Sequence, residues 1–291
     1  MFGLAAYGMW GVFPIYFKAL APAGSLEILA HRVVWSFLVC TVIWILRRDL
    51  SWVRPLIAVP HRLALLILAA VLLALNWLTY IHAVNSGNVV ESSLGYFINP
   101  LVLVLLGVTV LHEHLRPLQW TAVGIGVIAV SVISWDYGRL PWIALVLASS
   151  FAAYGFIKKK VGTSVEALPS MTVESAVLTP PAIAILAWIA GTGRGTFTHD
   201  APWHALLLAM SGVFTTGPLV CFAAAARRVP LTTMGLMQFV APVLQLLIGV
   251  LVFGERVTAV RWFGFGLVWV ALACLSFDSV HHAHSTRQRR T

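Results

Sequence analysis

Charged residues are scarce in this sequence. Aspartate and glutamate together number 10 and lysine and arginine 19 among 291 residues, so 10% of the chain is charged and 60% is hydrophobic. The mean hydropathy is +0.91. Because soluble domains are about 25% charged, this composition excludes an ordinary soluble protein. The formal charge of +9 does not indicate a nucleic-acid partner, since the basic residues lie between apolar runs and not on one polar face.

Cysteine is also rare, and its positions exclude a disulfide framework. Cys40, Cys221 and Cys274 all fall within apolar runs, where we expect small buried side chains. His112 and His114 are only two residues apart, unlike the helical zinc motif in which two histidines four residues apart share a face. The histidines near the C-terminus belong to a basic tail, so no metal site is expected.

Enzyme motifs are missing as well. The sequence contains no P-loop, no nucleophile elbow and no GxGxxG turn between a strand and a helix. We therefore expect no catalytic residue, no cofactor and no use of ATP.

Apolar runs of about 20 residues make up most of the chain, and this length crosses about 30 Å of hydrocarbon. They predict an all-α integral membrane protein with ten transmembrane helices. The first run, Phe2 to Phe17, lacks a basic leader, so we interpret it as a span and not as a cleaved signal peptide. The expected spans are 2–19, 27–46, 63–84, 91–111, 119–136, 141–157, 168–190, 203–226, 231–253 and 259–277.

Basic residues are distributed unequally between the two sets of connecting segments. One set, together with the tail, holds Arg47, Arg48, Arg54, Arg62, Arg116, Lys158, Lys159, Lys160, Arg227, Arg228, Arg287, Arg289 and Arg290. The opposite set holds Lys18, Arg139, Arg194, Arg256 and Arg261. Cytoplasmic loops of membrane proteins carry the excess of lysine and arginine. We therefore predict a multi-pass protein of a bacterial inner (plasma) membrane, with both termini in the cytoplasm.

An internal repeat emerges when the two parts of the chain are aligned so that Pro100 falls on Pro242, which we call the repeat alignment. Without a gap it also matches Phe97 with Phe239, Gly107 with Gly249, Glu113 with Glu255, Trp120 with Trp262, Gly124 with Gly266, Ser134 with Ser276 and Asp136 with Asp278. Shared apolar character is common in membrane proteins, but matched proline, glycine, glutamate and aspartate are not. The sequence therefore predicts two related halves.

Each half holds five expected spans, which is an odd number, so the second half must enter the membrane in the opposite sense. We expect two inverted five-helix repeats at 1–137 and 138–278, followed by a basic cytoplasmic tail at 279–291. Inverted repeats are typical of transporters that alternate access around a site near the middle of the membrane.

Two charges fall inside expected spans, Arg32 and Glu174, and the repeat alignment places them at equivalent positions. A charge near the bilayer centre costs about 2.5 kcal/mol or more unless it is paired or hydrated. Our hypothesis is that both side chains face a central cavity and pair with each other or with a zwitterionic substrate. The alternative is that Arg32 extends to the outer interface near Glu27.

The fourth and ninth spans carry matched prolines with polar neighbours. Proline inside a span frees a backbone carbonyl in the preceding turn, and such a carbonyl can bind a polar solute. A simple packing kink is the other interpretation. The substrate-pathway candidates in these spans are Tyr96, Asn99, Pro100, Gln238 and Pro242.

Further candidates lie in the first and third spans. Asn76 and Tyr80 share a helix face, and Asn76 needs a hydrogen-bonding partner in hydrocarbon, either another helix or the substrate. Trp10 and Pro14 allow the same two interpretations. We expect Lys18 and Lys158, at the ends of their spans, to be interfacial anchors. Glu91 and Glu174 are the carboxylates that could couple transport to protons.

The chain resembles the RarD branch of the EamA family, in the drug/metabolite transporter superfamily, along nearly its whole length. The most specific stretch is SLGYFINP at Ser93 to Pro100. The other matching residues are Trp10-Gly11, Pro14, Lys18, His31-Arg32, Trp35-Ser36, Asn76-Trp77, Ala83-Val84-Asn85, the run from Gly107 to Glu113, Gln238 and Pro242. The resemblance implies a ten-helix, inverted-repeat exporter of metabolites or drugs.

We therefore expect a secondary transporter that moves small metabolites, amino acids or drugs by alternating access. Its expected partners are a small-molecule solute and the lipid bilayer, with no nucleic acid. A proton is one candidate coupling ion, and facilitated exchange or uniport is equally compatible. The alternatives are a membrane-embedded enzyme acting on a lipid or isoprenoid, and a membrane scaffold or chaperone. An enzyme needs a clustered acid and base or a metal group at one interface, and the sequence offers none.

Overall fold

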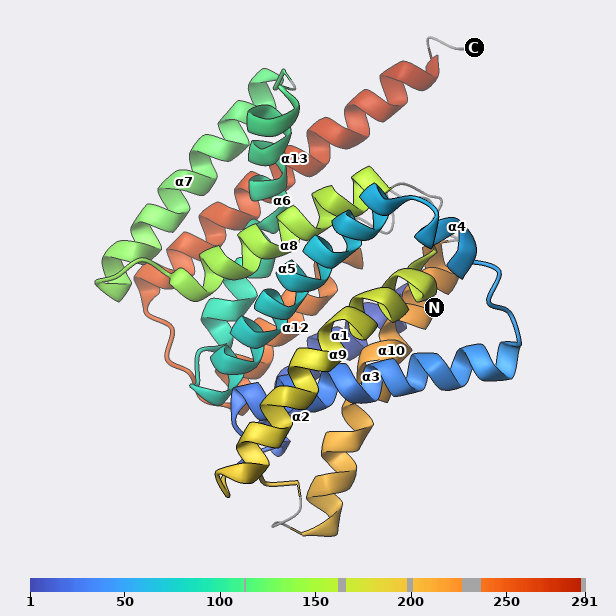
Figure 1. The fold of residues 1–291 in the computed structure, drawn as a ribbon. Coiled ribbons are helices and arrows are strands. Elements are labelled where there is room, and N and C mark those ends of the chain that lie inside the picture. The colour runs from blue at the N-terminus through green and yellow to red at the C-terminus, as the bar shows by residue number, and fades with distance from the viewer. Residues whose placement is uncertain (113, 162–165, 198–200, 227–236, 289–291) are drawn as a thin grey trace.

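The computed structural model describes residues 1–112, 114–161, 166–197, 201–226 and 237–288 (Figure 1). Every element in this part of the chain is a helix, which confirms the all-α prediction for it. The elements are α1 (Phe2–Gly11), α2 (Phe13–Ala19), α3 (Ser25–Arg47), α4 (Val53–Ile57), α5 (Pro60–Asn85), α6 (Val89–Leu111), α7 (Pro117–Tyr137), α8 (Trp142–Val161), α9 (Ala167–Gly191), α10 (Pro202–Ala226), α12 (Val240–Leu247), the π-helix η1 (Ile248–Val252) and α13 (Ala259–Gln288).

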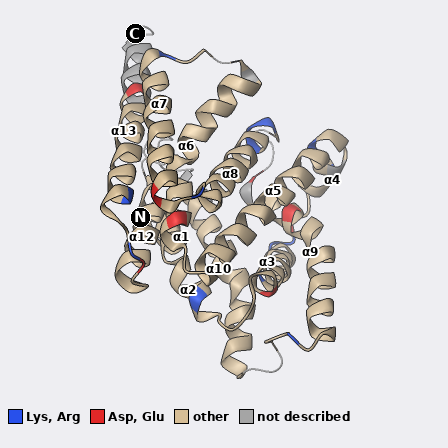
Figure 2. Cartoon of the chain, turned by 90° about the vertical axis from the view of Figure 1, so that its left-hand side faces the viewer, with Lys and Arg blue, Asp and Glu red and all other residues tan. Residues whose placement is uncertain are grey.

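Eight of these helices are long and apolar enough to cross a membrane, namely α3, α5, α6, α7, α8, α9, α10 and α13. The candidate spans within these helices match eight of the ten expected spans to within a few residues at each end. Charged residues are few along the helices and lie mostly toward their ends (Figure 2). The protein is therefore a multi-pass membrane protein.

The local sequence explains where several helices begin and end. Pro60 and Pro117 stand in the first turns of α5 and α7, where the missing N–H group of proline is no loss. α3 and α6 end at Arg48 and His112, whose φ angles of 51° and 53° are left-handed and stop the helix.

The first expected span, 2–19, is wrong as a single helix. α1 ends at Gly11 and α2 begins at Phe13, so the run is broken at Val12. Pro14 lies in the first turn of α2, where it has no N–H to bond the carbonyl of Trp10. The proline therefore ends one short helix and starts the next.

The ninth and tenth expected spans also differ from the structure. Residues 231–236 of the ninth lie outside the described residues, and the remainder forms the short helix α12 followed by η1. The tenth was expected to end at 277, but α13 continues as a helix through Gln288, into the expected tail.

Two helix pairs form the opposite ends of the molecule. α7 lies against α13 at one end, and α3 lies against α9 at the other, with α5, α6 and α8 between them (Figures 1 and 2). α10 packs on both α3 and α1. Gly212 permits the close approach of α10 to α3, because a Cβ atom there would lie inside van der Waals contact with the backbone of Trp35.

Candidate functional site

Arg32 lies two turns into α3 and points into the helix bundle. It is 4% exposed, and its Nε donates a hydrogen bond to Thr215 Oγ1 of α10 at 2.8 Å. The guanidinium carbon lies 4.0 Å from the ring centre of Trp77, 5.3 Å from that of Phe17 and 5.4 Å from that of Phe13. Cation–π contacts are worth about 0.5 kcal/mol when exposed and about 2 kcal/mol when desolvated. Aromatic rings therefore stabilise this buried charge.

Among the described residues no carboxylate neutralises Arg32, and its hydrogen bond there is donated by Nε and not by an Nη atom. Glu27, the nearest acid in α3, is occupied elsewhere. Its Oε1 accepts hydrogen bonds from the backbone N–H of Thr196 at 2.7 Å and from the Thr196 hydroxyl at 3.1 Å. Arg32 therefore does not extend to the outer interface beside Glu27.

Two tyrosines continue the aromatic wall. The ring centre of Tyr80 lies 5.9 Å from that of Phe17 and 5.8 Å from that of Tyr96. The Tyr80 hydroxyl is buried and has no hydrogen-bond partner in the described part of the chain. We call Arg32, Phe13, Phe17, Trp77, Tyr80 and Thr215 the Arg32 cluster. It draws on α2, α3, α5 and α10.

Asn76 and Asn99 join α5 and α6 to α8. Asn76 Nδ2 donates to the carbonyl of Leu147 and to Ser150 Oγ, both at 3.0 Å, and its Oδ1 accepts from the Tyr96 hydroxyl at 3.3 Å. Asn99 Nδ2 donates to the carbonyl of Ala148 at 3.3 Å. The predicted need of Asn76 for a partner is confirmed, and that partner is another helix.

Glu174 has its own cation and does not pair with Arg32. Its Oε1 lies 2.9 Å from Lys158 Nζ and accepts a hydrogen bond from Ser170 Oγ at 2.8 Å. Its Oε2 accepts from the Tyr154 hydroxyl at 3.3 Å, and Lys158 also donates to Ser170. The hypothesis of an Arg32–Glu174 pair is therefore wrong for this structure. Lys158 is an ion-pair partner, not the anchor that its place at a span end predicted.

Glu91, in the first turn of α6, ties that helix to the loop between α7 and α8. It is 1% exposed and binds Arg139 through two contacts, at 2.7 Å and 3.3 Å. Its Oε1 also accepts the backbone N–H of Ile143 at 3.1 Å. The hydrogen bond to Glu91 raises the pKa of Arg139.

The carboxylate of Glu255 caps the start of α6. Its two oxygens accept the backbone N–H groups of Val89 and Val90 at 2.6 Å and 2.8 Å. The first N–H groups of a helix have no partner in the helix, and its dipole favours an anion there. Burial raises the pKa of Glu255 and the charge of Glu91 adds to this, while the two amides and Lys18 act in the opposite sense.

Trp10 and Pro14 flank the break between α1 and α2. The Trp10 carbonyl, deprived of an N–H group at Pro14, accepts a hydrogen bond from Gln245 Nε2 of α12 at 3.2 Å. Gln245 is buried, and its Oε1 has no partner among the described residues. Pro14 therefore frees a backbone carbonyl, as was expected for prolines inside a span. The freed carbonyl of Trp10 binds Gln245, a side chain of the other predicted half.

The prolines and the glutamine of the fourth and ninth spans lie apart from the Arg32 cluster. Pro100 is half-buried within α6, which continues through it, and Pro242 is buried in α12. Gln238 is exposed. Glu113 and Gly235 lie outside the described residues.

Sequence reasoning missed Thr215, Gln245 and Arg139 as partners of the buried polar groups. Threonine is common in apolar helices, so Thr215 carries no signal of its own. Gln245 is a buried amide in an apolar run and could have been flagged as Asn76 was. Glu255 was visible in the repeat through its match to Glu113, but its partner at the start of α6 was not.

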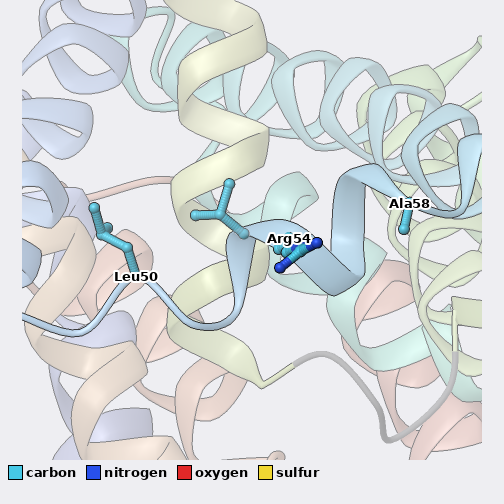
Figure 3. A pocket seen from close by; sticks show the side chains of 4 residues that line it. Leu50, Arg54 and Ala58 are labelled. Carbon is cyan, nitrogen blue, oxygen red and sulfur yellow. The ribbon is translucent and has the colours of Figure 1, made fainter.

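The pocket in Figure 3 has a volume of about 580 Å³ and lies beside α4, lined by Leu50, Val53, Arg54 and Ala58. None of the predicted site residues lines it. Over the residues that the structure describes, no group of three or more histidine, cysteine, aspartate or glutamate side chains could hold a metal ion.

A bundle of membrane-crossing helices around a buried charge, with no counter-ion among the described residues, defines a polytopic membrane protein with a candidate ligand site. The sequence model of the EamA-like transporter family matches residues 1–135 and 140–277. The chain belongs to this family, within the drug/metabolite superfamily, and acts on a small-molecule solute in a lipid bilayer. This assignment replaces the alternative of an enzyme acting on a lipid or isoprenoid.

Individual relatives agree with the family. The protein named Protein RarD from Streptomyces exfoliatus is 49% identical over 289 residues, covering 99% of this chain and 91% of its own length. An uncharacterized transporter from Vibrio cholerae is 40% identical, covering 100% of this chain and 95% of its own. They confirm the resemblance to RarD-type proteins.

One solved crystal structure has a TM-score of 0.61 to this chain, at 15% sequence identity. The similarity covers 94% of this chain and 95% of the other. At that identity the match shows a shared fold and nothing about the solute.

Proposed function

We propose that this protein is a secondary transporter that exports small metabolites, amino acids or drugs across a bacterial inner membrane by alternating access. The observation that carries the proposal is the Arg32 cluster. It places one buried cation between α2, α3 and α5 of the first predicted half and α10 of the second. A site shared between two halves can be exposed to either side when the halves move against each other.

The pattern of helix contacts supports two inverted repeats, at 1–137 and 138–278, and ten spans. In the repeat alignment, α1 and α2 correspond to α8, α3 to α9, α5 to α10, α6 to α12 with η1, and α7 to α13. α3 packs on α9 and α7 packs on α13, each on its own counterpart. α5 packs on α8 as α10 packs on α1, and α6 packs on α8 as α12 packs on α1. Equivalent contacts of this kind, in which each helix is replaced by its counterpart, are expected if a two-fold rotation relates the two halves.

Contacts between the halves occur toward both predicted sides of the membrane. On the predicted outer side, Glu255 of the second half caps α6 of the first. On the predicted inner side, Trp44 Nε1 of α3 donates to Thr172 Oγ1 of α9 at 2.9 Å. Alternating access requires that each set breaks while the other holds. The positive-inside asymmetry supports a cytoplasmic location of both termini and of the 279–291 tail.

Proton coupling through Glu91 or Glu174 is part of the proposal. Each carboxylate lies beside a basic side chain that could stabilise its charge while a proton is away, Arg139 and Lys158 respectively. The test replaces each glutamate by glutamine. Transport that stays coupled to pH in both variants would contradict this part.

Counterflow into proteoliposomes tests the transport function. Purified protein is reconstituted with an excess of an unlabelled solute inside, and entry of the labelled solute is measured for neutral amino acids, small organic acids and small amphipathic drugs. We expect one of these solutes to accumulate with the wild type and with Arg54→Gln, which removes an exposed charge. Accumulation should be lost with Arg32→Ala. Absence of counterflow for every solute in the panel would contradict the proposal.

A further inference from the structure

Arg32 is a permanent cation in an environment that offers it no anion. It is 4% exposed, and no carboxylate of the described residues lies within ion-pair distance of it. Glu27, Glu91 and Glu174 are each bound to other groups. Arginine keeps its proton in proteins, so it cannot escape the cost of burial by becoming neutral. A buried charge without a partner indicates that the partner is a ligand.

The neighbours of Arg32 leave one part of the guanidinium unused. Thr215 takes the Nε–H, and the ring of Trp77 lies 4.0 Å from the guanidinium carbon. The two Nη atoms have no acceptor among the described residues. Paired Nη–H groups of a planar guanidinium match the two oxygens of a carboxylate, which binds through two parallel hydrogen bonds.

The aromatic side chains of the cluster offer apolar contact surface next to the guanidinium. Phe13, Phe17, Trp77 and Tyr80 supply aromatic surface, and the Tyr80 hydroxyl is a buried group that no described residue bonds. This hydroxyl can hydrogen-bond a third polar atom of a ligand whose carboxylate is on Arg32. Within the cluster no acidic side chain is present to receive an ammonium group.

We infer that Arg32 binds the carboxylate of a small organic acid with an apolar body, and that anions of this class are the solutes of the proposed transport function. The inference rests on that function for the movement of the ligand but not for its binding. The uncompensated positive charge disfavours cations, and the lack of a carboxylate disfavours zwitterions relative to anions.

Equilibrium binding to the purified full-length protein tests this inference. The probe is labelled phenylpyruvate, an anion at pH 7, with phenylalanine and phenethylamine as competitors that keep the ring but carry a zwitterion and a cation. We expect phenylpyruvate to bind and phenethylamine not to displace it. Removal of one partner of a buried charge pair typically costs about 2 kcal/mol or more, so Arg32→Gln should weaken binding by about 30-fold. Arg54→Gln should leave binding unchanged.

Arg32→Gln could lose binding because it misfolds, and thermal unfolding detects this. Two further variants therefore test the binding role separately from folding. Arg32→Lys keeps the charge but loses the planar fork, and we expect about 10-fold weaker binding. Tyr80→Phe removes only the unpartnered hydroxyl and should weaken binding with no loss of fold. Wild-type affinity in both Arg32→Lys and Tyr80→Phe would overturn the inference.

Other outcomes separate this inference from the proposed transport function. If phenylpyruvate does not bind the wild type, or if phenethylamine displaces it equally well, the inference fails even where counterflow of another solute succeeds. If phenylpyruvate binds through Arg32 but no solute shows counterflow, the ligand class holds and the transport function fails.

Discussion

Arg32 donates one hydrogen bond to a side chain, and the other described groups that contact its guanidinium are aromatic. That bond, from Nε to Thr215 Oγ1, also fixes the guanidinium relative to α10. Thr215 in turn donates to the carbonyl of Ser211, so its oxygen is oriented by its own helix. One threonine therefore links the charge on α3 to the second half of the chain.

Replacement of Thr215 by valine should destabilise the protein. Valine keeps the shape but leaves the buried Nε–H of Arg32 without an acceptor, which costs about 1–3 kcal/mol. The measurement is thermal unfolding in detergent. Thr109→Val is the matched control, because the Thr109 hydroxyl is exposed and bonds only the carbonyl of Leu105 in its own helix. Equal unfolding temperatures for the two variants would contradict the role of Thr215.

Lys158 and Glu174 should behave as an energetic pair. A double-mutant cycle of Lys158→Met and Glu174→Gln should show a coupling energy of about 0.5–3 kcal/mol, measured by thermal unfolding, because Lys158→Met leaves the buried Glu174 without its cation. Additive effects would show that the contact at 2.9 Å contributes nothing.

The charge exchange Arg32→Glu with Glu174→Arg serves as the control for that pair. Since the two residues have separate partners, the exchange should not restore the stability that either single change removes. Recovery by the double variant would show that the two charges do meet in another state of the protein.

At this scale, sequence reasoning could locate the buried polar groups but not their partners. Arg32, Asn76 and Glu174 stand out because polar side chains are costly in hydrocarbon. The repeat alignment makes Arg32 and Glu174 equivalent in the two halves. Under the proposed two-fold relation, equivalent residues lie at related positions and not in contact, which accounts for the absence of the predicted pair.

Several polar contacts between the two predicted halves meet at the start of α6. Glu255 caps its first N–H groups, and Glu91 in its first turn binds Arg139 and the N–H of Ile143. Gly249 allows η1 to come this close, because a Cβ atom there would lie 2.9 Å from Val90 Cγ2. The cap therefore holds the predicted outer side closed in this structure.

Loss of the cap should open that side. We expect Glu255→Ala to increase the labelling of a cysteine at Ser92, which is buried in the first turn of α6, by a membrane-impermeant maleimide added outside. The background replaces Cys40, Cys221 and Cys274 by serine. Asp49→Ala is the control, since it removes an exposed acid on the predicted inner side. Labelling that stays at the wild-type level would contradict the capping role.

The opening should depend on pH with a defined sign. The capped carboxyl has a raised pKa, whereas a hydrated Glu255 in an open state has an ordinary one. The capped state therefore holds the proton more tightly, so low pH favours it and rising pH favours opening. We expect Ser92→Cys labelling to increase with pH through the raised pKa of Glu255. Glu255→Gln should flatten this dependence, and an unchanged pH profile would refute the assignment.

Helix positions were predictable because length and hydropathy fix them, and eight spans follow that rule. The first and ninth spans do not, for local reasons. Pro14 interrupts the first run and leaves the carbonyl of Trp10 without its helical hydrogen bond. Gln245 donates a hydrogen bond to that carbonyl instead. η1 is a π-helix, a form that composition does not reveal and that often marks functional positions.

Across the whole molecule, helices of the first predicted half and their counterparts in the second make corresponding contacts. The repeat is visible in the sequence as matched proline, glycine and glutamate residues, and the contacts of α5 and α6 with α8 repeat those of α10 and α12 with α1. Sequence alone could not show which helices of the two proposed halves contact each other, because hydrophobic runs carry no information about which neighbour they pack against. The membrane orientation stays a prediction from the basic loops.

The most direct test of the proposed transport function asks whether the Arg32 cluster can be reached from both sides of the membrane. A single cysteine at Thr215, in a background without Cys40, Cys221 and Cys274, is treated with an impermeant maleimide in right-side-out and in inside-out vesicles. Alternating access predicts labelling from both sides. Labelling from one side only, or from neither, in a protein that still unfolds in a cooperative thermal transition would contradict a transporter with its site at Arg32.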